Sequence, residues 1–207
     1  METSSRITSS GSTSASGVIH KPGFADPALC ERLMTFWERS RNLTSRESGA
    51  AAFFDGRVLH VREIHEVDEQ LGTELLTLAH RMAVTIADTY RTGPLYPDDV
   101  QVVKWWEGHE MRPHADSEHP DGSPHPTSWR SYAGVIYLNE HYRGGQIYFP
   151  DLELEIAPSQ GSFLAFGGGL DFRHGVRKIE QGVRYTCPSW FTRDQSRAVD
   201  LYLQRYG

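Results

Sequence analysis

The chain has 207 residues, of which 38% are hydrophobic and 23% are charged, and this composition predicts a single globular domain with a core of its own. The formal net charge of -6 argues against nucleic acid as a partner, because nucleic-acid-binding proteins usually carry a basic surface against phosphates. Two cysteines without a CxxC pair, no apolar run of membrane-spanning length and no signal sequence predict a cytoplasmic protein without a membrane partner. Nothing in the sequence fixes the oligomeric state.

The first half of the chain is predicted to be mostly helical. Residues 1–17 are rich in Ser, Thr and Gly and predict a flexible tail. Asp26 followed by Pro27 is typical of a helix start, and apolar residues at helical spacing extend that helix over residues 27–41. A second apolar face predicts a helix over residues 67–90. Short strands are expected at residues 18–20 and 57–61, and the long polar loop between the first helix and the second strand, residues 42–56, is a candidate lid.

From residue 99 onward the pattern changes to short β-branched and aromatic runs separated by Gly and Pro. These runs predict strands at residues 100–106, 131–138, 146–149, 152–156, 162–166, 173–179 and 184–192. Many short strands with frequent turns indicate an antiparallel sandwich or jelly roll, so the fold class is α+β with the helices packed on one outer face. Residues 197–206 predict a short closing helix.

One short segment has the spacing of a metal-ligand pair. His114 and Asp116 lie two residues apart, and in an extended strand such residues point to the same face. Two histidines and one carboxylate with open positions form the site of non-heme Fe(II) oxygenases. His119 and Asp121 repeat the spacing, but Pro120 and Gly122 predict a turn there, and a solvated surface histidine is the other interpretation of either pair.

His174, on a later predicted strand, is the candidate third ligand. Arg184 follows on the next strand across a predicted turn. Its planar guanidinium group could bind a carboxylate through two hydrogen bonds. These residues suggest an acidic, metal-chelating small molecule. The alternative, that Arg184 pairs with an acidic residue of the protein or is exposed, stays open on this reasoning alone.

Several ordered motifs resemble one known family. The segments are 112–116 (RPHAD), 135–139 (VIYLN) with 144–150 (GGQIYFP), 156–158 (IAP) with 161–166 (GSFLAF), and 174–176 (HGV) with 182–185 (GVRY) and 190–191 (WF). Together they resemble the prolyl-4-hydroxylase-like branch of the 2-oxoglutarate and Fe(II)-dependent dioxygenases. The resemblance covers residues 100–191, a little under half of the chain.

This resemblance implies a double-stranded β-helix in a single dioxygenase domain, residues 18–207, with its catalytic core at about residues 99–192. It implies Fe(II) bound by His114, Asp116 and His174, with 2-oxoglutarate and O₂ as cosubstrates. Arg184 would bind the far carboxylate of 2-oxoglutarate, and Tyr137 would share that carboxylate. Trp105 falls near the place where relatives have a tyrosine beside the iron, and an indole cannot replace a phenol in both donor and acceptor roles.

The resemblance further implies hydroxylation of an unactivated C–H bond with release of succinate and CO₂. We expect a small-molecule substrate, an amino acid or a compound derived from one, and Arg112, Arg130 and Trp106 are candidate substrate residues. The alternatives are a hydroxylase acting on prolyl residues of a peptide or protein, a nucleic-acid demethylase, which the acidic charge opposes, and a non-enzymatic jelly-roll binding module.

Overall fold

The computed structural model describes residues 17–46 and 53–207. Its helices are α1 (Pro27–Arg39), α2 (Val61–Val67), α3 (Glu69–Tyr90) and α4 (Asp200–Tyr206). Its strands are β1 (Ile19–Lys21), β2 (Val58–His60), β3 (Tyr96–Trp105), β4 (Met111–His114), β5 (Tyr132–Tyr137), β6 (Arg143–Gly144), β7 (Ile147–Phe149), β8 (Leu154–Ile156), β9 (Phe163–Gly167), β10 (His174–Val176), β11 (Ile179–Gln181) and β12 (Arg184–Thr192). None of the helices in these two ranges is long and apolar enough to cross a membrane.

Two antiparallel sheets form the β-layer of the molecule. The major sheet has six strands in the order β1-β9-β5-β12-β3-β2, and the minor sheet has four in the order β4-β10-β7-β8. β6 and β11 form a separate two-stranded ribbon. This arrangement confirms the predicted α+β class, and the two antiparallel sheets are those of a double-stranded β-helix.

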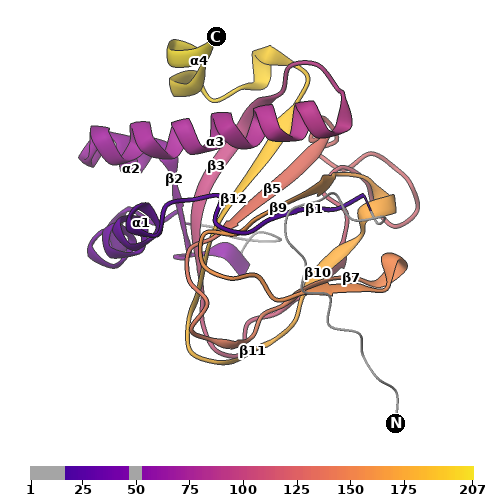
Figure 1. Cartoon of the computed structure of the whole chain (residues 1–207), viewed down its shortest axis with the longest axis horizontal. Coiled ribbons are helices and arrows are strands. Elements are labelled where there is room, and N and C mark those ends of the chain that lie inside the picture. The colour runs from indigo at the N-terminus through magenta and orange to yellow at the C-terminus, as the bar shows by residue number, and fades with distance from the viewer. Residues whose placement is uncertain (1–16, 47–52) are drawn as a thin grey trace.

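The helices cover one face of the major sheet. Figure 1 shows α3 crossing β3, β12 and β5 on one side, while β7 and β10 of the minor sheet lie on the other. The buried side chains of α3 and those of the major sheet that point toward it form the largest hydrophobic cluster of the described residues. The opposite face of the major sheet is therefore free to meet the minor sheet, and the functional site lies between them.

The first helix begins as its sequence predicts. The side chain of Asp26 accepts a hydrogen bond from the Ala28 amide at 2.8 Å, and Pro27 occupies the first turn. The helix ends at Arg39, two residues earlier than predicted, and a 3-10 turn at Arg41–Leu43 follows it. The predicted tail, apart from Gly17, and residues 47–52 of the predicted lid lie outside the described residues.

The predicted helix over residues 67–90 is two helices. α2 ends at Val67, and α3 starts with Asp68 as its N-cap, whose side chain accepts a hydrogen bond from the Leu71 amide at 2.9 Å. The chain turns here so that the backbone of Gly72 packs against His65. The predicted strand at residues 173–179 is likewise divided, because β10 ends at Val176 and residue 179 begins β11.

Candidate metal and 2-oxoglutarate site

His114 and His174 face each other across two paired strands of the minor sheet. β4 and β10 run antiparallel, and their register places the Cα atom of His114 directly opposite that of His174. The ring centroids are 4.5 Å apart. Two side chains that the sequence separates by 60 positions are therefore brought together by one strand pairing.

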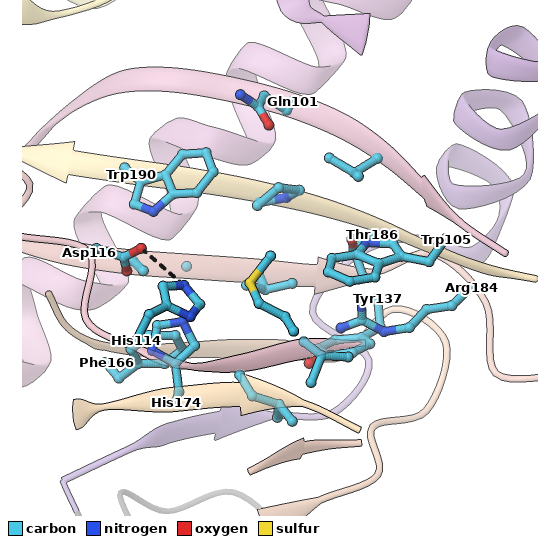
Figure 2. A pocket seen from close by; sticks show the side chains of 18 of the residues that line it. Gln101, Trp105, His114, Asp116, Tyr137, Phe166, His174, Arg184, Thr186 and Trp190 are labelled. Carbon is cyan, nitrogen blue, oxygen red and sulfur yellow. Dashed lines mark ion pairs between the residues drawn. The ribbon is translucent and has the colours of Figure 1, made fainter. Parts of the chain in front are cut away.

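Asp116 completes the cluster from the residue just beyond β4. Its backbone amide and that of Ser117 both donate to the carbonyl oxygen of Gly168, at 2.9 and 3.0 Å, which fixes the turn that carries the carboxylate. One ligand atom from each of His114, Asp116 and His174 lies within 4.8 Å of the others. Nε2 of His114 and Oδ1 of Asp116 are 4.0 Å apart, and Oδ2 of Asp116 is buried without a hydrogen-bond partner. Figure 2 shows the three side chains converging at one end of a cavity.

Backbone carbonyls set the tautomers of both imidazoles. Nδ1 of His114 lies 3.0 Å from the carbonyl oxygen of Arg112, and Nδ1 of His174 lies 3.0 Å from that of Phe172. A carbonyl only accepts, so each Nδ1 carries the hydrogen and each Nε2 offers a lone pair. Burial lowers the pKa of His174 to about 4, which keeps that imidazole neutral at neutral pH, as a metal ligand must be.

Arg184, Tyr137 and Trp105 form the other end of the same cavity. Arg184 starts β12 and lies opposite Trp105 of β3 in the strand register. Its guanidinium carbon is 5.0 Å from the ring centroids of both Trp105 and Tyr137, so an aromatic ring flanks the cation on each side. Gly145, with a φ of +69°, passes so close that a Cβ there would lie 3.1 Å from Cδ of Arg184. A close backbone approach therefore fixes the stem of this arginine.

This end of the cavity has donors without acceptors. Arg184 is 2% exposed, and no ion pair among the described residues includes it. Nε of Arg184, the hydroxyl of Tyr137 and Nε1 of Trp105 are buried without hydrogen-bond partners. Burial raises the pKa of Tyr137 to about 12, although the charge of Arg184 opposes the shift, so the phenol keeps its hydrogen. Buried unpaired donors around a cation are costly, and an anionic ligand would satisfy them.

The rest of the cavity wall is mainly apolar. The cavity has a volume of about 100 Å³. The sequence had not indicated Gln101, Thr186, Pro188, Trp190 or Phe54 as wall residues, although strand alternation with the Arg184 and Trp105 positions places most of them on the same face.

The three residues suggested for substrate binding lie outside this wall. Arg112 is exposed on β4, and its backbone carbonyl rather than its side chain serves the site. Arg130 donates to Asp98 at 2.9 Å and lies 4.1 Å from the ring centroid of Trp190, behind the wall. Trp106 points to the helical side of β3, where its ring is 6.0 Å from that of Trp37. None of these three side chains therefore lines the cavity in which a substrate would bind.

The second His-x-Asp pair lies in an exposed turn. The Gly122 amide donates to the carbonyl oxygen of His119 at 2.9 Å, and Gly122 has a φ of +81°. The Asp121 carboxylate accepts from Ser123 at the same turn rather than facing His119. Among the described residues this pair belongs to no group that could hold a metal ion.

The donor set fits Fe(II) and 2-oxoglutarate. Two neutral imidazole nitrogens and one carboxylate, with one carboxylate oxygen unpaired, are a 2-His-1-carboxylate set. The unpaired guanidinium at the far end of the cavity matches the second carboxylate of a dicarboxylic keto acid.

Comparison with known proteins agrees with this geometry. Residues 100–192 match the family described as the 2OG-Fe(II) oxygenase superfamily. Prolyl 3-hydroxylase 1 of Rattus norvegicus and of Homo sapiens are each 33% identical over 90 residues, covering 38% of this chain and 12% of theirs. The chain thus spans about an eighth of the length of these curated relatives.

Solved structures show the same fold. A Pseudomonas putida prolyl-4-hydroxylase is similar with a TM-score of 0.65 at 19% identity, covering 88% of this chain and 95% of that one. A prolyl hydroxylase from Trichoplax adhaerens, solved with a hypoxia inducible factor peptide fragment, has a TM-score of 0.64 at 16% identity, covering 89% and 87%. Residues 100–192, which include every strand from β4 to β12, therefore match the 2OG-Fe(II) oxygenase superfamily, and the chain shares the fold of solved prolyl hydroxylases.

Proposed function

We propose that the protein is an Fe(II)- and 2-oxoglutarate-dependent dioxygenase that hydroxylates a C–H bond of a small metabolite, an amino acid or a compound derived from one. The observation that carries the proposal is the single cavity with a 2-His-1-carboxylate set at one end and an unpaired buried arginine at the other. When bound, Fe(II) and 2-oxoglutarate supply the chemistry that places one oxygen atom of O₂ in the substrate and the other in succinate, with release of CO₂.

The residues of the chain have separate tasks in this reaction. His114, Asp116 and His174 would hold the metal, with both imidazoles oriented by backbone carbonyls. Arg184 would bind the far carboxylate of the cosubstrate, and the Tyr137 hydroxyl and the Trp105 indole N–H would donate to the same anion. The apolar wall excludes water from the reacting carbon.

The size of the cavity supports a small substrate. About 100 Å³ must accommodate the cosubstrate together with the reacting part of the substrate. Bulky side chains, among them Trp190 and Phe54, line the cavity and limit the space for a substrate.

Hydroxylation of a prolyl residue in a peptide or protein is the second candidate function. Its support is the sequence match to prolyl 3-hydroxylases and the likeness to a prolyl hydroxylase solved with a peptide fragment. The same ligands and the same arginine would serve it, so only substrates distinguish the two. A non-enzymatic binding module has less support, because a site without turnover has no need for the complete set of ligands and unpaired donors.

Anaerobic titration of Fe(II) and 2-oxoglutarate into the purified protein tests the dioxygenase assignment. We expect the weak visible charge-transfer band of the keto-acid chelate, and we expect His114→Ala to lose it. His119→Ala is the matched control, because this histidine lies in the exposed turn and its loss should leave the band intact. Absence of the band in folded wild-type protein, or its loss in the control alone, would contradict the assignment.

A further inference from the structure

The cavity has a polar group that neither the metal site nor the cosubstrate end uses. Gln101 lies on β3 four residues before Trp105, on the same face of the strand, and both line the cavity. Four residues of extended strand span about 13 Å, so Gln101 lies well away from the Arg184 end. Figure 2 shows Trp190 on the side of the cavity where Asp116 lies, and Gln101 between Trp190 and Trp105. This is the space left for the substrate.

The Gln101 amide has its orientation fixed by a carboxylate. Nε2 of Gln101 donates to Oδ2 of Asp99 at 2.6 Å. A carboxylate only accepts, so the amide nitrogen must face Asp99 and the amide oxygen must face the other way. Figure 2 shows that oxygen turned toward the cavity.

Asp99 is itself held in place by neighbouring residues. Its Oδ1 accepts from Nδ1 of His60 on the adjacent strand β2, at 3.0 Å, and Nη2 of Arg130 lies 3.9 Å from its Oδ2. A carboxylate anchored on both oxygens cannot rotate away and release the amide. Gln101 therefore presents an acceptor to the cavity, not a donor.

The acceptor has no donor of its own. No described residue donates a hydrogen bond to Oε1 of Gln101, whose side chain is bonded only through its nitrogen. Around it the wall is apolar, with Trp190, Pro188 and Val135 among its members. This oxygen is not among the buried atoms of the described residues that lack a partner, so water can reach it, and a substrate donor would replace that water. The carboxylate behind the amide also polarises it, which makes the oxygen a stronger acceptor and favours a charged donor.

We propose that Gln101 is a specificity-determining residue that selects substrates with a protonated amine. This proposal rests on the proposed dioxygenase function and narrows its substrate class to free amino or imino acids and similar amines. An internal prolyl residue of a peptide is acylated on its ring nitrogen and has no N–H to offer at that place. The fixed acceptor therefore disfavours the peptide substrates of the relatives.

The test compares paired substrates. Free L-amino acids, including L-proline, are each assayed beside their N-acetyl derivative, together with a prolyl peptide, and succinate formed above the substrate-free rate is measured. We expect turnover of at least one free amine, with its N-acetyl partner at least about 10-fold slower in kcat/KM. Gln101→Met keeps the length of the side chain and removes the acceptor, so kcat/KM for the free amine should fall about 10- to 100-fold while that for the acetylated partner stays constant.

Two further variants make the result specific. Asp99→Asn removes the carboxylate that fixes the Gln101 amide, so the amide group can rotate and present its nitrogen to the cavity. The preference for the free amine should then fall although Gln101 is present, as expected if Asp99 is a positioning residue. Gln195→Met, on the exposed turn before α4, is the matched control and should change neither rate.

The keto-acid chelate band, recorded on the same samples, separates the two levels of the proposal. If the band does not form, the dioxygenase function itself is wrong. If the band forms but acetylated amines or the prolyl peptide react as fast as free amines, or no free amine reacts, the role of Gln101 is wrong and the dioxygenase function stands. An unchanged preference in Gln101→Met would also overturn it.

Discussion

Arg184 is a buried cation without a carboxylate partner among the described residues, and this has consequences for both binding and stability. A charge-assisted hydrogen bond to a carboxylate contributes about 1.5–3 kcal/mol. We therefore expect Arg184→Gln to raise the KM for 2-oxoglutarate about 10- to 100-fold, with little change in metal affinity. Steady-state kinetics at saturating metal and a metal titration measure the two quantities separately.

The same substitution should not destabilise the protein without ligands. Removing one member of a buried ion pair is costly because it leaves the other charge unpaired, but here no described carboxylate would be left behind. The free energy of unfolding of the metal-free variant, measured by urea denaturation, should equal or exceed that of the wild type. Arg143→Gln, which removes an exposed ion pair with Glu180, is the control and should leave KM unchanged. A large loss of stability in Arg184→Gln would show that the arginine has a structural role.

Glu38 is one residue through which acid should lower the stability of the fold. Burial works to raise the pKa of its carboxyl, but hydrogen bonds from Lys104, Tyr185 and Arg41 outweigh burial and lower the pKa from 4.5 to about 2. A folded-state pKa below the unfolded one stabilises the fold above pH 4.5, and that stabilisation is lost as the pH falls from 4.5 toward 2. The difference in unfolding free energy between wild type and Glu38→Gln should therefore shrink between pH 6 and pH 3.5.

Lys104 provides the control for this pH dependence. Its ammonium is buried, pairs with Glu38 and lies 4.7 Å from the ring centroid of Trp37. Lys104→Met retains the aliphatic stem against these rings and removes the charge. In that background the effect of Glu38→Gln should depend less on pH, and an equal pH dependence with and without Lys104 would mean that another group is responsible.

The three residues that gather at the candidate metal site could be predicted from the sequence, but the wall of the cavity could not. A two-residue spacing on an extended segment identifies His114 and Asp116 as a pair, and ordered motifs add His174 and Arg184. The role of Gln101 depends on the direction in which its amide points, and that direction is set by Asp99 and by His60 from another strand. Arg130 is the opposite case. Its charge suggested a substrate-binding residue from the sequence, but in the fold its guanidinium donates to Asp98.

At the scale of elements, the break between α2 and α3 is held by a close backbone approach. A Cβ at Gly72 would lie 2.6 Å from Cα and Cβ of His65. Alanine normally stabilises a helix interior by about 1 kcal/mol relative to glycine. Here the clash should reverse the sign, and we expect Gly72→Ala to lower the free energy of unfolding by about 1–3 kcal/mol. Urea denaturation measures it, with Gln70→Ala on the exposed side of the same turn as a control that stays within about 0.5 kcal/mol. Stabilisation by Gly72→Ala would show that the two helices can part at this point without cost.

Most elements could be predicted because their periodicity and end signals agree. Asp26 and Pro27 start α1, and the alternating pattern locates the long strands β5 and β12 within a residue or two. The pattern fails where an apolar face continues through a change of direction. Asp68 is a helix cap inside such a run, and only tertiary packing distinguishes it from an ordinary exposed helix residue. The division of residues 173–179 between β10 and β11 likewise follows from their different partner strands, β4 and β7 on one side and β6 on the other.

At the scale of the whole molecule, the site lies across the two sheets. His174 belongs to β10 and His114 to β4 of the minor sheet, whereas Arg184 and Tyr137 belong to β12 and β5 of the major sheet. A metal alone would therefore join residues from one sheet only. A cosubstrate that chelates the metal and also reaches Arg184 would connect both sheets, so its binding should stabilise the fold as a whole.

Thermal unfolding with Mn(II), which stands in for the iron, and 2-oxoglutarate tests this coupling. A ligand at about 100 times its dissociation constant stabilises by about 2.7 kcal/mol, or roughly 5–10 °C in a chain of this size. We expect a rise in Tm with the metal, a further rise with 2-oxoglutarate, and little rise with 2-oxoglutarate alone, since the keto acid needs the metal as its second anchor. His174→Ala should lose both increments relative to its own baseline, and Arg184→Gln should keep the first and lose most of the second. An equal effect of 2-oxoglutarate with and without metal would place its binding site outside the cavity, because only within it do the metal ligands and Arg184 act on one molecule.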